Sequence, residues 1–253
     1  MRGSESSDFL QRISTNDLSH FSDGAVRTTL LVSDKGRIID TIWAVHRNDH
    51  VLLLLSKGTA ERNIGWLNKY IIMEDIVLTD VSSRYSVTIF ADIERGQYRS
   101  DYYGHPVSFT LEAPPLEVSD NFPGYEQWRI GKGIPKFGHE IVEEYNPLEL
   151  NLWNWISFTK GCYIGQEVIA RLDTYNKVQR SLCLFSAGNV VHERAVLCDS
   201  SGNDLGKITS VINDGSTVIG LAMIRTVAVS TGSLFHLKGT DITVSIVKVF
   251  RKG

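Results

Sequence analysis

The sequence predicts an α+β region followed by a small all-β barrel or sandwich. Residues 28–90 alternate short β-rich runs with one segment of helical periodicity. After about residue 178, only short β-rich runs recur, and turn-forming clusters separate them. The 253 residues are 42% apolar, which is enough to bury a sizeable core, and the length suggests one or two domains.

The N-terminal elements follow from their apolar spacing. Residues 8–13 predict a short helix. Residues 28–32 and 38–45 predict a hairpin, because the polar loop between these β-rich runs contains Gly36. The later elements of this region are a strand at 51–55, a helix at 59–70 and strands at 76–78 and 85–90.

The second half of the chain begins with many breakers. Glycine and proline interrupt residues 95–124, which predicts an irregular stretch with one strand at 107–111. Residues 125–133 predict a helix, which ends before Pro135. We place the start of the barrel near residues 178–181. Its expected strands are residues 181–186, 195–199, 206–212, 217–223 and 242–250.

Charge and hydropathy argue against several functional classes. The net charge of −3 and the pI near 6.2 give no support to a nucleic-acid partner, which would require a basic patch. No apolar run approaches the roughly 20 residues that span a bilayer. The first residues also lack the apolar core of a signal peptide. We therefore expect a cytoplasmic protein without a membrane partner.

The three cysteines differ in their surroundings. Their odd number argues against a disulfide framework, and without a CxxC pair the sequence itself supplies no metal or cluster site. Cys183 and Cys198 lie in apolar strand-like runs, which predicts two small buried side chains. Cys162 lies instead between glycine and tyrosine, outside any strand pattern.

The segment around Cys162 is the most informative stretch of the chain. Residues 160–167 read Lys-Gly-Cys-Tyr-Ile-Gly-Gln-Glu. Glycines permit tight turns and close approach, and a cysteine beside a cation on a turn is typical of a reactive or ligating thiolate. The alternative is a structural turn in which Cys162 only packs. The remaining motif residues are expected to shape or orient the loop: Lys160, Gly161, Tyr163, Gly165, Gln166 and Glu167, with Arg171 as an i,i+4 partner of Glu167.

Residues 157–171 resemble the signature segment of the YgfZ proteins. That family comprises folate-binding relatives of the glycine-cleavage T-protein, an aminomethyltransferase, and is implicated in iron–sulfur protein maturation. The resemblance implies a T-protein-like fold with three small domains around a central cleft. The expected domains are a discontinuous folate-binding domain (1–45 and 113–178), an α+β domain (46–112) and the barrel (179–253). The resemblance also implies tetrahydrofolate or another reduced folate as ligand, and iron–sulfur client or assembly proteins as partners.

Asp40 is a candidate catalytic residue, together with Cys162. It lies in the apolar run Ile38-Ile39-Asp40-Thr41-Ile42, where a carboxylate is costly to bury unless it is hydrogen-bonded or lines a cavity. Residues 37–40, following Gly36, resemble the T-protein segment that carries its catalytic aspartate, which implies that Asp40 orients the folate nitrogen for one-carbon transfer. The alternative is a satisfied structural aspartate.

A second candidate group lies in the helix predicted over residues 125–133. Tyr125 and Trp128 could stack on a flat heterocycle, and Arg129 could hold a carboxylate tail. The alternative is core packing. The segment resembles the YgfZ region in which an aromatic residue contacts folate. Where T-proteins carry a pterin-gripping glutamate, this chain has Gly131, so Glu140 or Glu126 is the candidate substitute in space.

Three functional hypotheses remain open from the sequence. The first is a folate-binding factor that assists iron–sulfur assembly or repair. The second is a tetrahydrofolate-dependent aminomethyltransferase or demethylase, which Asp40 favours and which Gly131 and the Cys162 segment oppose. The third is a non-enzymatic interaction module with a vestigial pocket. An early Asn16-Asp17 pair also resembles the family, and its expected role is backbone capping.

Overall fold

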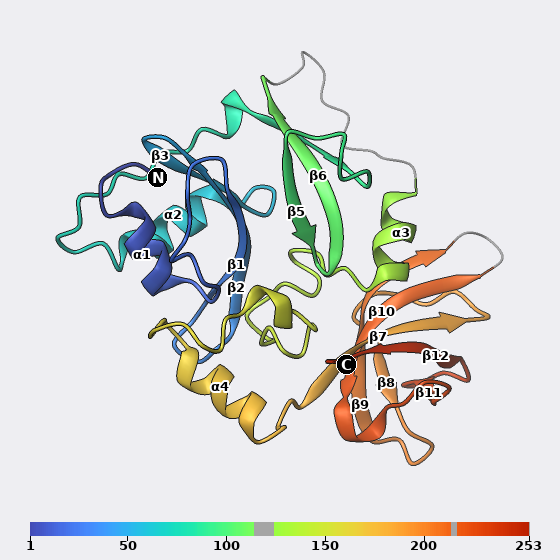
Figure 1. Ribbon diagram of the computed structural model, residues 1–253. Helices are drawn as coiled ribbons and strands as arrows, with labels where there is room; N and C mark the ends of the chain where they lie inside the picture. The colour runs from blue at the N-terminus through green and yellow to red at the C-terminus, as the bar shows by residue number, and fades with distance from the viewer. Residues whose placement is uncertain (114–123, 214–216, 253) are drawn as a thin grey trace. The chain divides into compact units, whose positions relative to one another are not determined.

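The computed structural model describes residues 1–113, 124–213 and 217–252 (Figure 1). The chain forms two compact units, and each contains two separate stretches of sequence. Unit 1 comprises residues 1–120 and 154–170, and unit 2 comprises residues 121–153 and 171–253. The expected division into three domains with other boundaries stays a prediction.

Unit 1 begins with an antiparallel sheet and two helices. The sheet has the order β1-β2-β3 and is formed by β1 (Val26–Val32), β2 (Ile38–Arg47) and β3 (His50–Leu54). The helices are α1 (Ser6–Ile13) and α2 (Ala60–Asn68). Apolar residues of both helices and of the sheet form one core. The predicted hairpin is confirmed, and Gly36 in its loop has a φ of 65°.

A second antiparallel sheet of unit 1 corrects the expectation of an irregular stretch. It has the order β4-β6-β5 and contains β4 (Ser86–Phe90), β5 (Tyr98–Tyr102) and β6 (His105–Glu112). The two-residue turn between β5 and β6 has positive φ at Tyr103 (53°) and Gly104 (87°), as tight hairpin turns require. The strand expected at 76–78 is wrong, because Val77 makes only an isolated bridge to Arg2. Pro114, Pro115 and Pro123 lie outside the described residues.

Unit 2 contains the predicted barrel, which is closed and has the strand order β10-β7-β12-β11-β8-β9. Its strands are β7 (Arg180–Ala187), β8 (Val196–Cys198), β9 (Asp204–Asn213), β10 (Val218–Arg225), β11 (Leu234–Leu237) and β12 (Thr243–Phe250). The sequence prediction missed β11, which has only four residues. Inward-facing side chains from all six strands fill the interior, as is usual for small barrels.

Two further helices lie outside these sheets. Helix α3 (Tyr125–Lys132) is confirmed, and it ends at Gly133, whose φ of 71° belongs to the left-handed region. Helix α4 (Gln166–Thr174) begins directly after the cysteine segment. Short 3-10 turns occur at Ser82–Arg84, Trp153–Trp155 and Thr226–Ala228. Among the described residues, no helix is both long and apolar enough to cross a membrane.

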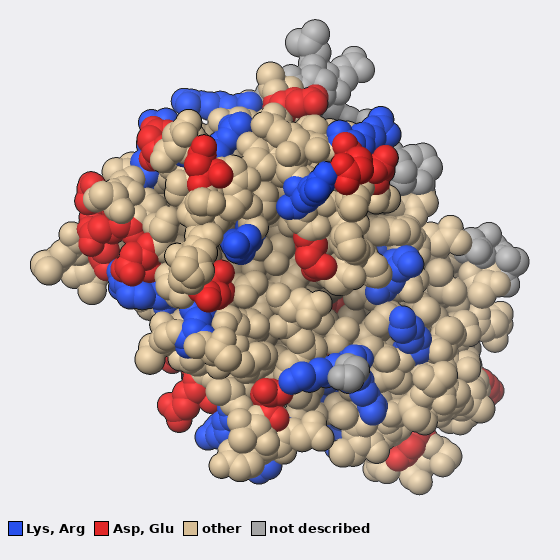
Figure 2. Space-filling view, in the orientation of Figure 1, with Lys and Arg blue, Asp and Glu red and all other residues tan. Residues whose placement is uncertain are grey.

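Charged side chains of both signs are interspersed over the face that Figure 2 draws. This distribution agrees with the near-neutral composition of 26 basic and 29 acidic residues. A protein that coats nucleic acid presents a basic stripe or patch instead. The expectation that the chain has no nucleic-acid partner stays a prediction.

Candidate functional site

Lys160 fixes the cysteine segment to the loop that follows α1. Its side chain is 9% exposed, and its Nζ donates hydrogen bonds to the backbone oxygens of Ser14 (2.9 Å) and Asn16 (2.5 Å). The ammonium group also lies 5.4 Å from the ring centroid of Tyr163. Burial lowers the pKa of Lys160 to about 8. The motif lysine is therefore an anchor inside unit 1.

Gly165 fixes the same segment to the β1–β2 loop. A Cβ atom at Gly165 would lie 2.4 Å from the backbone oxygen of Ser33 and 3.2 Å from the Cα of Gly36. Its φ of 77° is also in the region that favours glycine. At Gly36, a Cβ would lie 3.2 Å from the side chain of Val168. The two glycines thus allow two distant parts of the chain to meet at backbone contact distance.

Cys162 is displayed on this anchored segment. It is a free, exposed cysteine, and a Cβ at neighbouring Gly161 would meet nothing within 4 Å. Tyr163, in contrast, is buried, and burial raises the pKa of its hydroxyl to about 12. The geometry favours an accessible thiol over a side chain that packs the loop. Cys183 and Cys198 are buried in the barrel, as predicted.

The end of the motif forms the start of α4. Gln166 lies 3.5 Å, through its side-chain Nε2, from the backbone oxygen of Lys160, so it helps to close the loop. Glu167 and Arg171 are both exposed on α4. Their expected ion pair stays a prediction.

The Asn16-Asp17 pair caps backbone groups, as expected. The Asn16 side chain donates from Nδ2 to the Thr28 oxygen (2.7 Å) and accepts at Oδ1 from the Asp17 amide (2.9 Å). Asp17 accepts at Oδ1 from the Ser19 amide (2.9 Å). Because Lys160 binds the Asn16 oxygen, these contacts also support the anchor of the cysteine segment.

Asp40 is fully buried and surrounded by donors. Its Oδ1 accepts hydrogen bonds from the Thr41 amide (2.8 Å) and the Ser56 hydroxyl (2.6 Å). Its Oδ2 accepts from the Thr59 hydroxyl (2.6 Å) and the Asn63 side-chain amide (2.5 Å). Thr59 is the N-cap residue of α2, so the carboxylate ties β2 to the start of this helix. Four donors satisfy a buried carboxylate, which favours the alternative of a structural aspartate.

Arg129 and Glu140 form a buried brace in unit 2. The side chain of Arg129 is 1% exposed and that of Glu140 is fully buried, and their charged groups lie 3.6 Å apart. Arg129 also donates to the Ile134 oxygen (3.0 Å) and to the Ser210 hydroxyl (3.0 Å), and Ser210 donates to Glu140 (2.7 Å). The brace therefore joins α3 to barrel strand β9.

The remaining charges of Arg129 and Glu140 are also engaged. Glu126 accepts two hydrogen bonds from Arg129, at 2.6 and 3.0 Å, and Glu140 accepts one from the Lys136 amide (3.0 Å). Burial raises the pKa of Glu126, but the hydrogen bond and charge of Arg129 outweigh this, so the pKa lies below its usual value. These contacts leave Arg129 as a structural cation, without a free fork for a folate carboxylate.

Tyr125 and Trp128 form an aromatic pair on α3 in unit 2. Their ring centroids lie 6.1 Å apart, and Trp128 is 36% exposed. Gly131 is exposed on the same helix, and a Cβ there would meet nothing within 4 Å. A flat heterocycle could therefore stack on this pair, and a longer side chain would fit at position 131.

The sequence did not reveal the partners that decide these roles. Ser56, Thr59 and Asn63 around Asp40, and Ser210 beside Arg129, are small polar residues without a motif. Their only signal is polarity in otherwise apolar or amphipathic segments. Among the described residues, no group of three His, Cys, Asp or Glu side chains could hold a metal ion.

Comparison with known proteins places this geometry in a known fold. Residues 1–90 match the family model described as the GCVT N-terminal domain. The crystal structure of glycine cleavage system aminomethyltransferase T from Bartonella henselae matches with a TM-score of 0.74 at 16% identity, over 98% of this chain and 81% of that one. The chain has the T-protein fold. The predicted fold class, mixed α and β with a C-terminal barrel, is confirmed.

Sequence relatives agree with the T-protein fold. A chloroplastic protein of Arabidopsis thaliana, described as a candidate transferase, is 28% identical over 98% of this chain and 67% of its own length. An aminomethyltransferase of Herpetosiphon aurantiacus is 24% identical over 82% of this chain and 70% of its own length. These similarities support an aminomethyltransferase-like chain. The placement among the YgfZ proteins and in the cytoplasm stays a prediction.

Proposed function

We propose that this chain is a folate-binding protein that assists iron–sulfur cluster assembly or repair through Cys162. The observation that carries the proposal is the contrast in burial and contacts within residues 160–167. Lys160, Tyr163 and Gly165 are buried or locked by contacts, whereas Cys162 is exposed. A thiol held in water by a rigid segment suits contact with a partner protein or a cluster intermediate.

In this proposal, tetrahydrofolate or another reduced folate stacks on Tyr125 and Trp128. Trp128 is exposed and Tyr125 is half-buried, and their ring centroids lie 6.1 Å apart. Arg129 and Glu140 support α3 within unit 2, and Asp40 has a structural role within unit 1, because their polar atoms already have partners within the chain. The bound folate would supply a ligand or a one-carbon acceptor.

Calorimetry with tetrahydrofolate tests the folate part. We expect binding by the wild type and by Cys162→Ser, and weaker binding by Trp128→Ala at unchanged thermal stability. Absence of binding by the wild type would refute the folate part. The assembly part requires that Cys162→Ser lowers the activity of iron–sulfur enzymes in cells that depend on this protein, while Cys183→Ser, a buried cysteine, serves as control.

A second candidate function is aminomethyl transfer. The match of residues 1–90 to the GCVT N-terminal domain and the aminomethyltransferases among the relatives favour it. Formation of methylenetetrahydrofolate from an aminomethylated lipoyl carrier would support this function. If the chain is an enzyme, we expect a tetrahydrofolate-dependent one-carbon transferase.

A further inference from the structure

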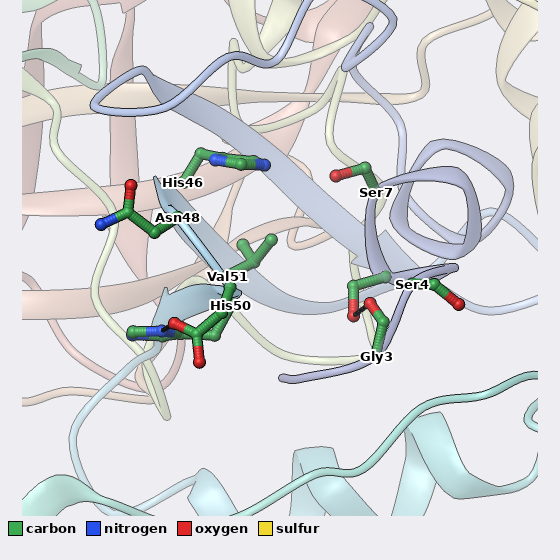
Figure 3. A pocket seen from close by; sticks show the side chains of 9 residues that line it. Gly3, Ser4, Ser7, His46, Asn48, His50 and Val51 are labelled. Atoms are coloured by element: carbon green, nitrogen blue, oxygen red, sulfur yellow. Dashed lines mark hydrogen bonds and ion pairs between the residues drawn. The ribbon is translucent and has the colours of Figure 1, made fainter.

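A polar pocket opens in unit 1 beside the start of α1 (Figure 3). Its volume is about 320 Å³, at the lower end of the range of roughly 300–1,000 Å³ for ligand pockets. Two segments line it: Gly3, Ser4, Ser6 and Ser7, and His46, Asn48, Asp49, His50 and Val51. Cavities with a polar lining hold water or polar ligands, whereas empty cavities are apolar.

His46 is held with its imidazole toward this pocket. Its ring packs edge-on against Phe21, with centroids 5.2 Å apart and an interplanar angle of 86°. Its Nδ1 is buried without a hydrogen-bond partner among the described residues, and the nearest carboxylate oxygen, of Asp23, is 4.0 Å away. The ring of His46 and the hydroxyl of Ser7 point toward each other across the pocket (Figure 3).

The carboxylate of Asp49 has partners of its own beside the pocket. Asp49 lies 2.8 Å from the Nδ1 of His50 and 3.7 Å from the Nε of Arg2. The two groups that face each other across the pocket in Figure 3 are a hydroxyl and an imidazole, both of which can donate hydrogen bonds. A metal does not suit the pocket, because the described residues contain no group of three His, Cys, Asp or Glu ligands that could hold one.

We propose that this pocket binds a small oxyanion of the phosphate class between Ser7 and His46. The hydroxyl and the imidazole would each donate one hydrogen bond to the anion. The volume admits either a free phosphate ion or the head of a small phosphate monoester. The lining contains neither Cys162 nor the aromatic pair of α3, so the test of this pocket does not depend on folate binding.

Titration of the whole protein with two probes tests the proposal. Inorganic phosphate and glycerol phosphate are added at constant ionic strength, with chloride as reference, and NMR signals of the histidine rings report the contact. We expect saturable shifts of the His46 ring and at least tenfold weaker binding by both Ser7→Ala and His46→Phe. The phenylalanine keeps the ring contact with Phe21, and thermal unfolding checks that it folds.

The control is His192→Gln, which removes an exposed histidine of unit 2 and is expected to bind as the wild type does. Tighter binding of glycerol phosphate than of phosphate identifies a monoester site, and the reverse identifies a site for the free ion. The proposal is overturned if neither probe binds above the chloride reference. It is also overturned if binding survives in both pocket variants or is lost equally in His192→Gln.

Discussion

Replacing Arg129 with methionine is expected to lower the free energy of unfolding by about 3–5 kcal/mol. This is the typical cost of removing one partner from a buried ion pair, because the other charge is left without compensation. Glu140 would remain fully buried, with hydrogen bonds from Ser210 and the Lys136 amide but without the nearby guanidinium. Methionine fills much of the volume of the arginine stem, so the loss reflects the charge rather than a cavity.

Urea denaturation followed by circular dichroism measures this change. The matched control is Lys132→Met on the same helix, whose side chain is exposed and whose effect should stay within about 0.5 kcal/mol. The double variant Arg129→Met/Glu140→Gln should regain part of the loss, since it removes both charges, and the double-mutant cycle gives the coupling. The reasoning is refuted if Arg129→Met leaves stability unchanged but weakens tetrahydrofolate binding, because Arg129 would then be a ligand.

Three further predictions concern the glycines and the motif lysine. Gly165→Ala should destabilise the protein by about 1–3 kcal/mol, because φ is positive there and the added Cβ would clash with the Ser33 oxygen. Gly161→Ala should be neutral, and equal urea midpoints for the two variants would contradict this reasoning. Burial lowers the pKa of Lys160, so between pH 8 and 10.5 the unfolded chain binds one more proton than the folded chain, and this group makes the stability rise with pH. Urea midpoints measured across that range should depend less on pH in Lys160→Met than in the wild type. An unchanged pH dependence in the variant would contradict this reasoning. Gly131→Glu should be as stable as the wild type or more stable, because position 131 is helical and an added side chain meets open space. Calorimetry should show tighter tetrahydrofolate binding by this variant. Weaker binding by the folded variant would count against a pterin near α3.

Local patterns predicted most elements but missed those that depend on tertiary contacts. The β5–β6 hairpin was missed because its turn has Tyr103 at positive φ, where glycine or asparagine is the usual signal. Tyr103 is held there by stacking on Trp155, with centroids 4.8 Å apart, and by a hydroxyl contact of 3.0 Å with Thr41. Such long-range support has no local signature.

The candidate site shows the same limit at the level of single residues. The motif around Cys162 could be recognised from glycine, lysine and cysteine spacing alone. The role of Lys160 could not, because its acceptors lie 146 and 144 positions away, at Ser14 and Asn16. Arg129 was likewise expected to hold a folate carboxylate, because no local signal indicates that Ser210, 81 positions later, lies beside it.

Because the three cysteines differ in exposure, thiol labelling can measure opening of the barrel in the unmodified protein. Cys162 is open to reagents, whereas Cys183 and Cys198 lie inside the barrel. A maleimide dye should therefore label one site in the native state and three sites only after the barrel opens. The rate at which the second and third labels appear would measure opening of the barrel without any engineered probe.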